Sequence, residues 1–483
     1  MRSFIFIFCF VFLCQAFAAQ TSEQIPGEYL VKYREHAQLA AFKLRATVGV
    51  RLLAEIPSAK LLQIHIAPKH EAKALQSLSD GLDSNIEYIA PNLVVSMLTA
   101  PFEATGATDA TDATAAKNQE AQWALAKIRA EDAWQAAGHR GSRSVVIAVI
   151  DTGADYRHES LAPNMVPGRD FINNSNDPMD NRTSGHGTHC SGVIGATGLI
   201  DGGTIGISPQ VSIMPLRFLD ENGRGSTANA IRAIDYAIEH RVQIISASWG
   251  SRATPSEAKP MIEAVKRASD AGVIFVMSAG NHGENTDHYD TYPANAKFAN
   301  TITVGASSED ESRPDWSNYG RSKVDLVAPG KAILSTLPEN RYGKKSGTSM
   351  AAPLVSGLTA FLMAQQPSLS GEMIRSLLQV TGAYSPVLSA CDCRIDALNA
   401  TKALLNEKMF IVPAARTMEV GESIHFKVVF GQAPFVFRVM NTDVGTIDQF
   451  GKFTATASGL TTVKVIDATG TETSTLAIRV VEN

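Results

Sequence analysis

The chain has 483 residues, of which 45% are hydrophobic and 19% charged, and its formal net charge is −5. This length predicts two or three domains of ordinary globular composition, and the slightly negative charge argues against a nucleic-acid partner. With only 5 cysteines the chain is not a disulfide-dense scaffold.

Residues 1–18 have the pattern of a secretory signal peptide. Arg2 gives a short positive region, an apolar core follows over 4–14, and Ala16 and Ala18 mark a small-residue cleavage site. The apolar run is too short to span a bilayer, and no later run is long and apolar enough for a membrane helix. We therefore expect a secreted protein, extracellular or associated with the cell surface, without a membrane span.

Residues 19–99 predict a small α+β unit. The expected elements are a helix over 70–78 and strands over 28–33, 61–66 and 86–95, the last broken by a turn. Residues 100–118 are rich in Ala, Thr and Asp and predict a flexible linker that proteases can reach.

Residues 119–408 alternate between strand and helix patterns. The strand expected over 144–150 is almost continuously apolar, which is typical of a strand covered on both faces. This rhythm predicts an α/β fold with a parallel sheet and helices on both sides. Over 409–483 the helical patterns vanish and short alternating strands predict a small β-sandwich.

Asp151 directly follows the buried strand that ends at residue 150. The carboxyl ends of parallel strands line the functional crevice of such sheets, so this carboxylate is a candidate catalytic group. A helix cap is the ordinary structural alternative.

His186 lies in the run His-Gly-Thr-His-Cys and is a candidate general base. The same run offers a rival, because His186, His189 and Cys190 stand at i, i+3 and i+4 and could hold a metal on one helix face. No His-Glu-x-x-His run occurs, and no carboxylate stands at the spacing of a zinc hydrolase.

Ser349 lies where a Gly-containing turn meets a predicted helix. Thr348 is the expected N-cap and Pro353 marks the expected helix start, since proline is tolerated in a first turn. The amides and the positive dipole end there suit a developing negative charge. The chain order Asp151, His186, Ser349 is one of the known orders of a catalytic triad.

Three segments, Asp151-Thr-Gly, His186-Gly-Thr-His and Gly347-Thr-Ser-Met-Ala-Ala-Pro, together resemble the subtilisin-like serine proteases (subtilases) over about 119–408. The resemblance implies that Ser349 attacks a peptide carbonyl, that His186 transfers the proton and that Asp151 orients the imidazole. It also implies that the Asn281 side chain and the Ser349 amide bind the oxyanion.

The resemblance further implies two strands that pair with an extended polypeptide substrate, and a main specificity pocket. The substrate-binding residues it implies are Gly223, Arg224, Gly225, Ser248, Trp249, Gly250, Ala279, Gly280 and Thr291. Aromatic, apolar and basic side chains all remain open for the pocket, because Thr291 is small and Asp287 and Asp290 are nearby in the sequence.

Residues 19–99 resemble the inhibitory propeptide of this family, and 410–483 a bacterial Ig-like module. We therefore expect a monomeric zymogen that is inhibited by its own propeptide and cuts its own linker. Adhesion, spacing from a surface and stabilisation are all open roles for the C-terminal module. Cys391 and Cys393 either close a small ring or stay free.

No cofactor is expected for catalysis, but structural calcium is common in the family. Ser160 stands where relatives often have a carboxylate ligand, whereas Asp177 and Asp180 could supply two calcium ligands. Two other function classes stay open beside the secreted serine endopeptidase: a catalytically silent secreted binding protein on the same scaffold, and a metallohydrolase built on His186, His189 and Cys190.

Overall fold

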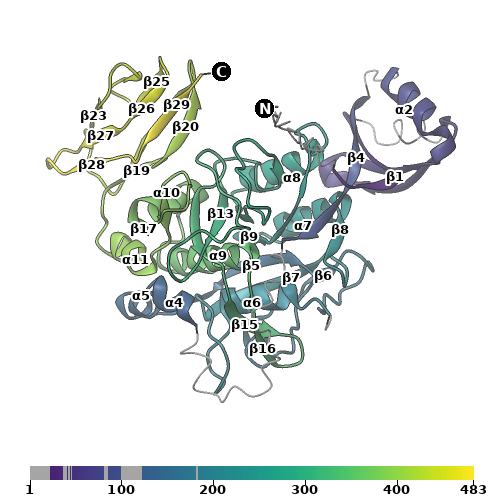
Figure 1. Cartoon of the computed structure of the whole chain (residues 1–483), viewed down its shortest axis with the longest axis horizontal. Helices are drawn as coiled ribbons and strands as arrows, with labels where there is room; N and C mark the ends of the chain where they lie inside the picture. Colours follow the sequence, from purple (N-terminus) through teal and green to yellow (C-terminus); the bar gives the residue numbers. More distant parts are fainter. Residues whose placement is uncertain are drawn as a thin grey trace, which may run out of the picture.

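The computed structural model describes residues 22–35, 41, 44, 46–80, 85–98, 122–180 and 183–482. The predicted signal peptide and the predicted linker lie outside these residues. Three units follow one another across the molecule, with the small N-terminal unit at one end, a large central unit, and a β-rich C-terminal unit at the other end (Figure 1). Among the described residues, no helix has the length and apolar character needed to cross a membrane.

The N-terminal unit is an antiparallel sheet with one helix against it. Its elements are β1 (Gln24–Tyr33), β2 (Val50–Ile56), β3 (Leu61–Ile66), α2 (Glu71–Asp80) and β4 (Ile86–Met97). The predicted strands and helix form, but β2 was missed. The predicted break in the last strand was wrong, because β4 runs through Pro91 as one strand of 12 residues.

This sheet is apolar on both faces. Val31 and Ile64 belong to the unit's own core beneath α2, whereas Leu30 and Leu61 belong to a cluster shared with the central unit. The alternation follows from the period of two along a strand. One face of the N-terminal sheet is therefore buried against the central unit.

The central unit contains a nine-stranded sheet in the order β17-β18-β14-β13-β11-β9-β5-β7-β6. All its pairs are parallel except the edge pair of β17 and β18. Its helices are α4 (Trp123–Lys127), α5 (Ala130–Ala137), α6 (His186–Gly195), α7 (Thr227–Glu239), α8 (Lys259–Asp270), α9 (Thr348–Gln365), α10 (Gly371–Thr381) and α11 (Ala397–Leu405). Its strands are β5 (Gly141–Asp151), β6 (Arg169–Asp170), β7 (Gln210–Arg217), β8 (Arg224–Ser226), β9 (Ile244–Ala247), β10 (Trp249–Arg252), β11 (Ile274–Ser278), β12 (Thr291–Tyr292), β13 (Thr301–Ser307), β14 (Leu326–Pro329), β15 (Ile333–Leu337), β16 (Arg341–Lys345), β17 (Ala383–Tyr384) and β18 (Cys393–Arg394).

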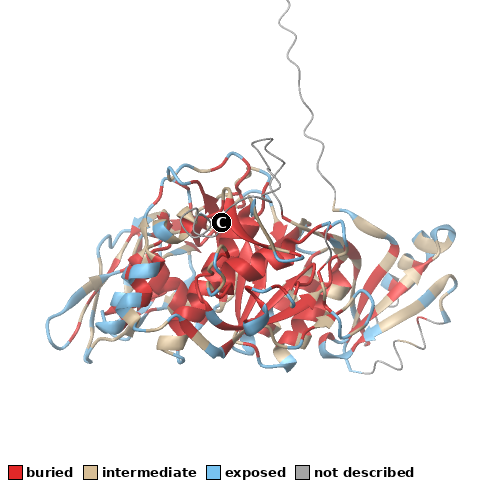
Figure 2. Cartoon of the chain, turned by 90° about the horizontal axis from the view of Figure 1, so that it is seen from below, coloured by how far each residue is buried: buried red, intermediate tan, exposed pale blue. Residues whose placement is uncertain are grey.

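Helices cover both faces of this sheet, as the continuous apolar strands predicted. In β5, Ile147 and Val149 belong to the core that contains α6 and α9, while Ala148 and Ile150 belong to the core that contains α7 and α8. Successive residues of a strand point to opposite faces, so a strand buried on both sides has no polar phase. Buried residues accordingly concentrate in the middle of the molecule (Figure 2).

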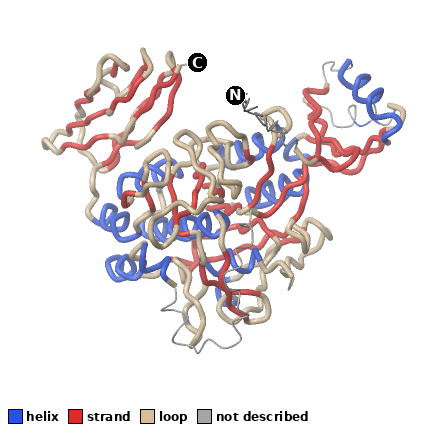
Figure 3. The backbone as a smooth tube through the Cα atoms, viewed as in Figure 1, coloured by secondary structure: helices blue, strands red, loops and turns tan. Residues whose placement is uncertain are grey.

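The C-terminal unit consists of short strands in several small sheets, with loops at both ends (Figure 3). Its strands are β19 (Phe410–Val412), β20 (Arg416–Glu419), β21 (Ser423–His425), β22 (Lys427–Val429), β23 (Val436–Val439), β24 (Gly445–Ile447), β25 (Lys452–Ala455), β26 (Gly459–Thr461), β27 (Val463–Ile466), β28 (Glu472–Ser474) and β29 (Ile478–Val481). They surround a separate apolar core that includes Phe426, Phe453 and Val465.

Strand β19 joins the C-terminal unit to the central one. Phe410 and Val412 belong to the apolar core of the central unit, whereas Ile411 between them belongs to the C-terminal core. The Ala414 amide also donates to the Ser376 hydroxyl of α10 at 3.1 Å. The two units therefore share a packed boundary. Cys391 and Cys393, in the chain just before α11, form a disulfide, which answers the question that their spacing left open.

Candidate active site

Asp151, His186 and Ser349 come from three elements that meet at the carboxyl edge of the central sheet. Asp151 is the last residue of β5, His186 the first of α6 and Ser349 the second of α9. Helices α6 and α9 pack against each other and against β5. All three side chains are fully buried in this form of the chain.

Asp151 and His186 form a hydrogen-bonded pair. His186 Nδ1 lies 2.8 Å from Asp151 Oδ1, which also accepts the Thr152 amide at 2.8 Å. Burial lowers the pKa of the His186 imidazole, but the neighbouring Asp151 carboxylate outweighs it, so the net shift of that pKa is upward. The pair can hold the imidazole in the tautomer that leaves Nε2 free to accept a proton.

The Ser349 hydroxyl lies near two carbonyl oxygens. Its Oγ is 2.5 Å from the oxygen of Leu98 and 3.1 Å from that of Ser248. His186 Nε2 is buried and has no hydrogen-bond partner among the described residues. The hydroxyl is therefore directed at the chain's own backbone in this form.

The start of α9 differs from the predicted one. Gly347 is the N-cap, so Thr348 is the first helical residue and Pro353 the sixth. A proline inside a helix has no amide to bond the carbonyl four residues earlier, which here is that of Ser349. That oxygen instead accepts the Ser248 hydroxyl at 3.0 Å and the Cys190 thiol at 3.4 Å.

Asn281 lies close to Ser349 and is held by the first residue of α9. Its Oδ1 accepts the Thr348 amide and the Thr348 hydroxyl, both at 2.9 Å. Its Nδ2 donates to the Leu98 carbonyl oxygen, the same oxygen that faces Ser349 Oγ. The Asn281 side-chain amide is thus held with its N–H donor directed at a peptide carbonyl, as an oxyanion-binding group requires.

Strand β4 lies between the two strands that the sequence assigned to substrate. It pairs antiparallel with β8 through Val95 and Gly225, and antiparallel with β10 through Met97 and Trp249. The Met97 amide donates to the Gly223 carbonyl at 2.9 Å. The chain's own segment therefore occupies the place expected for an extended substrate.

Gly223 has a left-handed backbone conformation, which favours glycine, where Met97 passes it. Its φ is +71°, and a Cβ there would meet the Met97 side chain at 2.5–2.7 Å. Arg224 follows in β8 and pairs with Glu23. The structure thus brings this predicted strand together with the N-terminal unit.

Ser248 and Gly250, two of the predicted substrate-binding residues, lie next to Leu98. Its amide donates to the Ser248 carbonyl at 3.2 Å, and a Cβ at Gly250 would lie 3.5 Å from Leu98 Cδ1. Thr291 pairs with β10 through Arg252. Ala279 is fully buried, and Gly280, with φ +109°, leads into Asn281.

The rival metal site on His186, His189 and Cys190 does not assemble. His189 Nε2 lies 2.9 Å from the Ile333 carbonyl and 3.1 Å from that of Gly343, and burial lowers the pKa of this imidazole to about 3. Within the described part of the chain, the residues close enough to share a metal are Asp151, His186 and Cys190. That cluster contains the aspartate–histidine pair itself.

Asp177 and Asp180, the predicted calcium ligands, serve different partners. Asp177 accepts the Tyr156 hydroxyl at 3.0 Å. Asp180 accepts the Thr188 amide and hydroxyl at 3.0 and 2.7 Å, and burial raises its pKa to about 6. The two carboxylates bond to different partners, whereas calcium prefers several oxygen ligands around one point. Calcium at this position stays a prediction.

The sequence analysis missed Leu98 and assigned Ser248 only to substrate binding. The Leu98 carbonyl faces Ser349, although nothing local marks Leu98 as part of the site. The Ser248 hydroxyl donates a hydrogen bond to the Ser349 carbonyl oxygen. The sequence signal for such a donor was Pro353, because a proline four residues after Ser349 leaves that carbonyl without its helical hydrogen bond.

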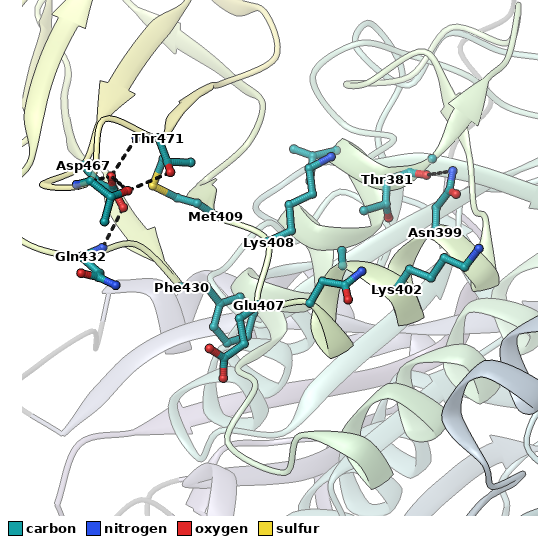
Figure 4. Close-up of a pocket in the computed structure, with 15 residues that line it drawn as sticks. Thr381, Asn399, Lys402, Glu407, Lys408, Met409, Phe430, Gln432, Asp467 and Thr471 are labelled. Carbon is teal, nitrogen blue, oxygen red and sulfur yellow. Dashed lines mark hydrogen bonds between the residues drawn. The ribbon is translucent and has the colours of Figure 1, made fainter.

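A further cavity lies away from these residues. It has a volume of about 690 Å³ and lies where α11 and the chain after it face the C-terminal unit (Figure 4). Its lining includes Lys402 of α11 and, across from it, Asp467 of the C-terminal unit, with Met409 near Asp467 (Figure 4). None of the predicted site residues lines it.

Comparison with known proteins agrees with this geometry. The model of the subtilase family matches residues 142–405, more than half of the chain, and the model of the bacterial Ig-like domain (group 2) matches residues 407–478. Thermitase of Thermoactinomyces vulgaris is 35% identical over 260 residues, which cover 54% of this chain and 88% of thermitase. The major intracellular serine protease of Bacillus subtilis (strain 168) is 38% identical over 242 residues, 50% of this chain and 74% of that protein. The chain therefore belongs to the subtilase family and is a serine endopeptidase with a bacterial Ig-like domain.

Proposed function

We propose that this serine endopeptidase uses Ser349 as nucleophile, His186 as general base and acid, Asp151 as the orienting carboxylate and Asn281 as an oxyanion donor. The 2.8 Å contact of His186 with Asp151 and the direction of Asn281 Nδ2 support these roles. Extended polypeptides are the substrates, since β8 and β10 hold an antiparallel strand between them.

We propose further that the chain is a zymogen inhibited by its own N-terminal unit. The observation that carries this is the 2.5 Å distance from Ser349 Oγ to the carbonyl oxygen of Leu98. Because Leu98 presents its carbonyl to the nucleophile, the bond to be cut is the one from Leu98 to Thr99. This position lies just before the linker in which the sequence analysis expected the cut.

The cleavage follows the acyl-enzyme route of serine proteases. The Ser349 hydroxyl leaves the Ser248 carbonyl, gives its proton to His186 Nε2 and attacks the Leu98 carbonyl carbon. Asn281 Nδ2 stabilises the resulting oxyanion. The intermediate then expels the amine of Thr99, which takes the proton from His186, and water hydrolyses the Leu98 ester by the reverse proton transfers.

The cut N-terminal unit would remain bound as an inhibitor, because its contacts do not depend on the cleaved bond. Lys32 pairs with Glu263 at 2.9 Å, and Ser58 donates to Asp235 at 2.7 Å, both on the helices beneath the sheet. Leu93 and Val95 lie in the apolar cluster shared with those helices. Full activity therefore requires removal or degradation of this unit.

We also propose secretion of the protein. The signal pattern of residues 1–18 and the match to a bacterial Ig-like domain support an extracellular location. We also propose structural calcium at Asp177 and Asp180, which adding a chelator during thermal unfolding would test.

A two-inhibitor assay of the processed enzyme tests the proposed chemistry. Phenylmethylsulfonyl fluoride is expected to abolish peptide cleavage by modifying Ser349, while phenanthroline leaves the rate unchanged. Mass spectrometry should place the added sulfonyl group on Ser349. The opposite inhibitor response would favour a metallohydrolase, and binding without any cleavage would favour a silent scaffold.

Cys190 makes the site sensitive to mercurials. Burial raises the pKa of its thiol, which lies 3.9 Å from His186 Nδ1 and 3.4 Å from the Ser349 carbonyl oxygen. A mercury atom on Sγ would displace the imidazole, so p-chloromercuribenzoate is expected to remove at least about nine-tenths of the activity, a loss of more than about 1.4 kcal/mol in transition-state stabilisation. The measurement is residual activity against the stoichiometry of modification.

The control for this experiment is Cys190→Ala, whose remaining activity the mercurial should not reduce. Full activity of the original protein after confirmed modification of Cys190 would contradict the prediction.

A further inference from the structure

We propose that Asp180 is a positioning residue for the reaction, whose carboxylate holds the helix that carries His186 against the strand that carries Asp151. Asp180 acts through two threonines and not on the reacting atoms. The inference rests on the proposed function, because it takes His186 as the base of the reaction. It gives Asp180 a role in catalysis that is separate from the calcium proposed there.

Helix α6 has no side-chain cap of its own. Its N-cap is Gly185, which makes no side-chain cap hydrogen bond, and His186 is its first residue. The first amides of an α-helix have no partner inside the helix, so they need acceptors from elsewhere. The acceptors at this end of α6 therefore help to set where the imidazole lies.

Two side chains from outside α6 accept these amides. The Thr152 hydroxyl oxygen accepts the Gly187 amide at 2.9 Å, and Asp180 Oδ2 accepts the Thr188 amide at 3.0 Å. Thr152 directly follows Asp151, the last residue of β5. The start of the helix is thus bonded to the end of the strand, and a carboxylate lies at the positive end of the helix dipole.

The two threonine hydroxyls connect the elements in opposite directions. Thr188 of α6 donates its hydroxyl proton to Asp180 at 2.7 Å, and its oxygen accepts the amide of Asp155, beyond β5, at 3.0 Å. The Thr152 hydroxyl is also hydrogen-bonded to the Asp180 carboxylate. Each threonine therefore accepts an amide of the other element while its hydroxyl bonds to Asp180.

The Asp180 carboxylate fixes the orientation of both hydroxyls. A threonine hydroxyl has one proton and two lone pairs, so donating the proton to Asp180 leaves the lone pairs for the amides. Asp180 is only 5% exposed, so water cannot readily replace it as the acceptor. Loss of the carboxylate would leave buried donors without a partner, and α6 would shift to find others.

The catalytic pair is sensitive to such a shift, because α6 and β5 are in direct contact. A Cβ at Gly187 would lie 2.0 Å from the Gly153 carbonyl oxygen and 3.1 Å from Asp151 Cβ. Asp151 Oδ1 accepts the Thr152 amide and lies close to His186 Nδ1, both at 2.8 Å. A displacement of about 1 Å near the reacting groups can lower a rate by about 100-fold.

The test replaces Asp180 with alanine and measures two rates. One is the first-order rate constant of self-cleavage in the full chain, and the other is kcat of the processed enzyme on a peptide substrate. Both are expected to fall about 10- to 100-fold. KM should stay unchanged, because Asp180 belongs to neither of the substrate strands β8 and β10.

Two variants of Thr188 keep the inference testable if Asp180→Ala does not fold. Thr188→Val retains the shape and the backbone amide but removes the hydroxyl, so it should lower kcat less than Asp180→Ala does. Thr188→Ser retains the hydroxyl and should keep the original kcat. Equal kcat values for Thr188→Val and Thr188→Ser would overturn the inference.

Asp396→Ala is the matched control. Asp396 is 4% exposed and caps another helix, α11, by accepting the Asn399 amide at 2.9 Å. Its loss should lower the thermal midpoint without changing kcat or the rate of self-cleavage. An equal loss of kcat in this variant would show that any lost helix cap has the same effect, and the inference would be wrong.

Proton NMR tests the position of the imidazole directly. The hydrogen bond to Asp151 moves the resonance of the His186 Nδ1 proton downfield. In Asp180→Ala this resonance should move upfield or broaden, whereas in Asp396→Ala it should stay in place. An unchanged resonance together with an unchanged kcat in Asp180→Ala overturns the inference.

Assays with added calcium and with a chelator separate this role from calcium binding. A hydrogen-bonding role predicts that the chelator leaves kcat of the original protein unchanged. If the chelator lowered that kcat as far as Asp180→Ala does, Asp180 would act through a cation and the inference would fail. Failure of the proposed function looks different: the original protein does not cleave itself, and phenylmethylsulfonyl fluoride does not label Ser349.

Discussion

Replacing Ser349 with alanine is expected to leave the bond between Leu98 and Thr99 intact and to lower kcat by about 10⁶-fold, the magnitude known from the nucleophile of subtilisin, a related protease. The reason is geometric, because Ser349 Oγ is the group that lies 2.5 Å from the Leu98 carbonyl oxygen. Intact mass and N-terminal sequencing would show the original protein beginning at Thr99, and Ser349→Ala retaining the N-terminal unit.

The control for this experiment is Ser346→Ala. Ser346 lies in the same loop, but its hydroxyl accepts the Ala332 amide at 2.9 Å and takes no part in the proposed chemistry. This variant should mature at Thr99. Production in a cell-free system without proteases keeps host enzymes from cutting the linker. If Ser349→Ala matured there with the same N-terminus, self-processing would be ruled out.

Replacing Phe410 with alanine is expected to destabilise the catalytic unit by about 3–5 kcal/mol, the usual cost of emptying a buried aromatic site. Phe410 lies in the C-terminal unit's first strand but is buried in the core of the catalytic unit, where it is 3% exposed. The measurement is the temperature at which proteolytic activity is lost, compared with the calorimetric unfolding of the whole chain.

The neighbouring residue supplies a matched contrast. Ile411 belongs to the C-terminal core. Ile411→Ala should therefore lower the unfolding temperature of the Ig-like unit more than the temperature at which proteolytic activity is lost. Val436→Ala, at a position that is 50% exposed, should change the free energy of unfolding of either unit by no more than about 0.5 kcal/mol. If heat inactivation is the same for Phe410→Ala and the original protein, the C-terminal unit does not stabilise the catalytic one.

The C-terminal unit has three open roles: adhesion, spacing from a surface and stabilisation. Adhesion and surface spacing require a module that is independent of the catalytic unit. The shared boundary at β19 and the Ala414–Ser376 hydrogen bond instead favour stabilisation. Removal of residues 409–483 should therefore expose apolar surface on α10 and α11 and lower stability further.

The parts of the fold that depend on local pattern can be predicted from the amino-acid sequence. The continuous apolar run before Asp151 required a strand covered on two sides, and the structure divides its residues between two cores. The segments around Asp151, His186 and Ser349 could also be selected as candidate site segments from the sequence, because each combines a reactive side chain with the turn or helix start that holds it.

The surroundings of those side chains depend on long-range packing, which local pattern does not reveal. Local pattern could not show that β4 enters between β8 and β10, because strand pairing over more than a hundred residues is selected by burial and backbone hydrogen bonds, not by spacing. The same limit explains the metal alternative: His189 shares a helix with His186, yet its side chain turns to two backbone carbonyls of β15 and β16. Helical spacing gives proximity along one element, whereas packing against other elements decides which groups meet.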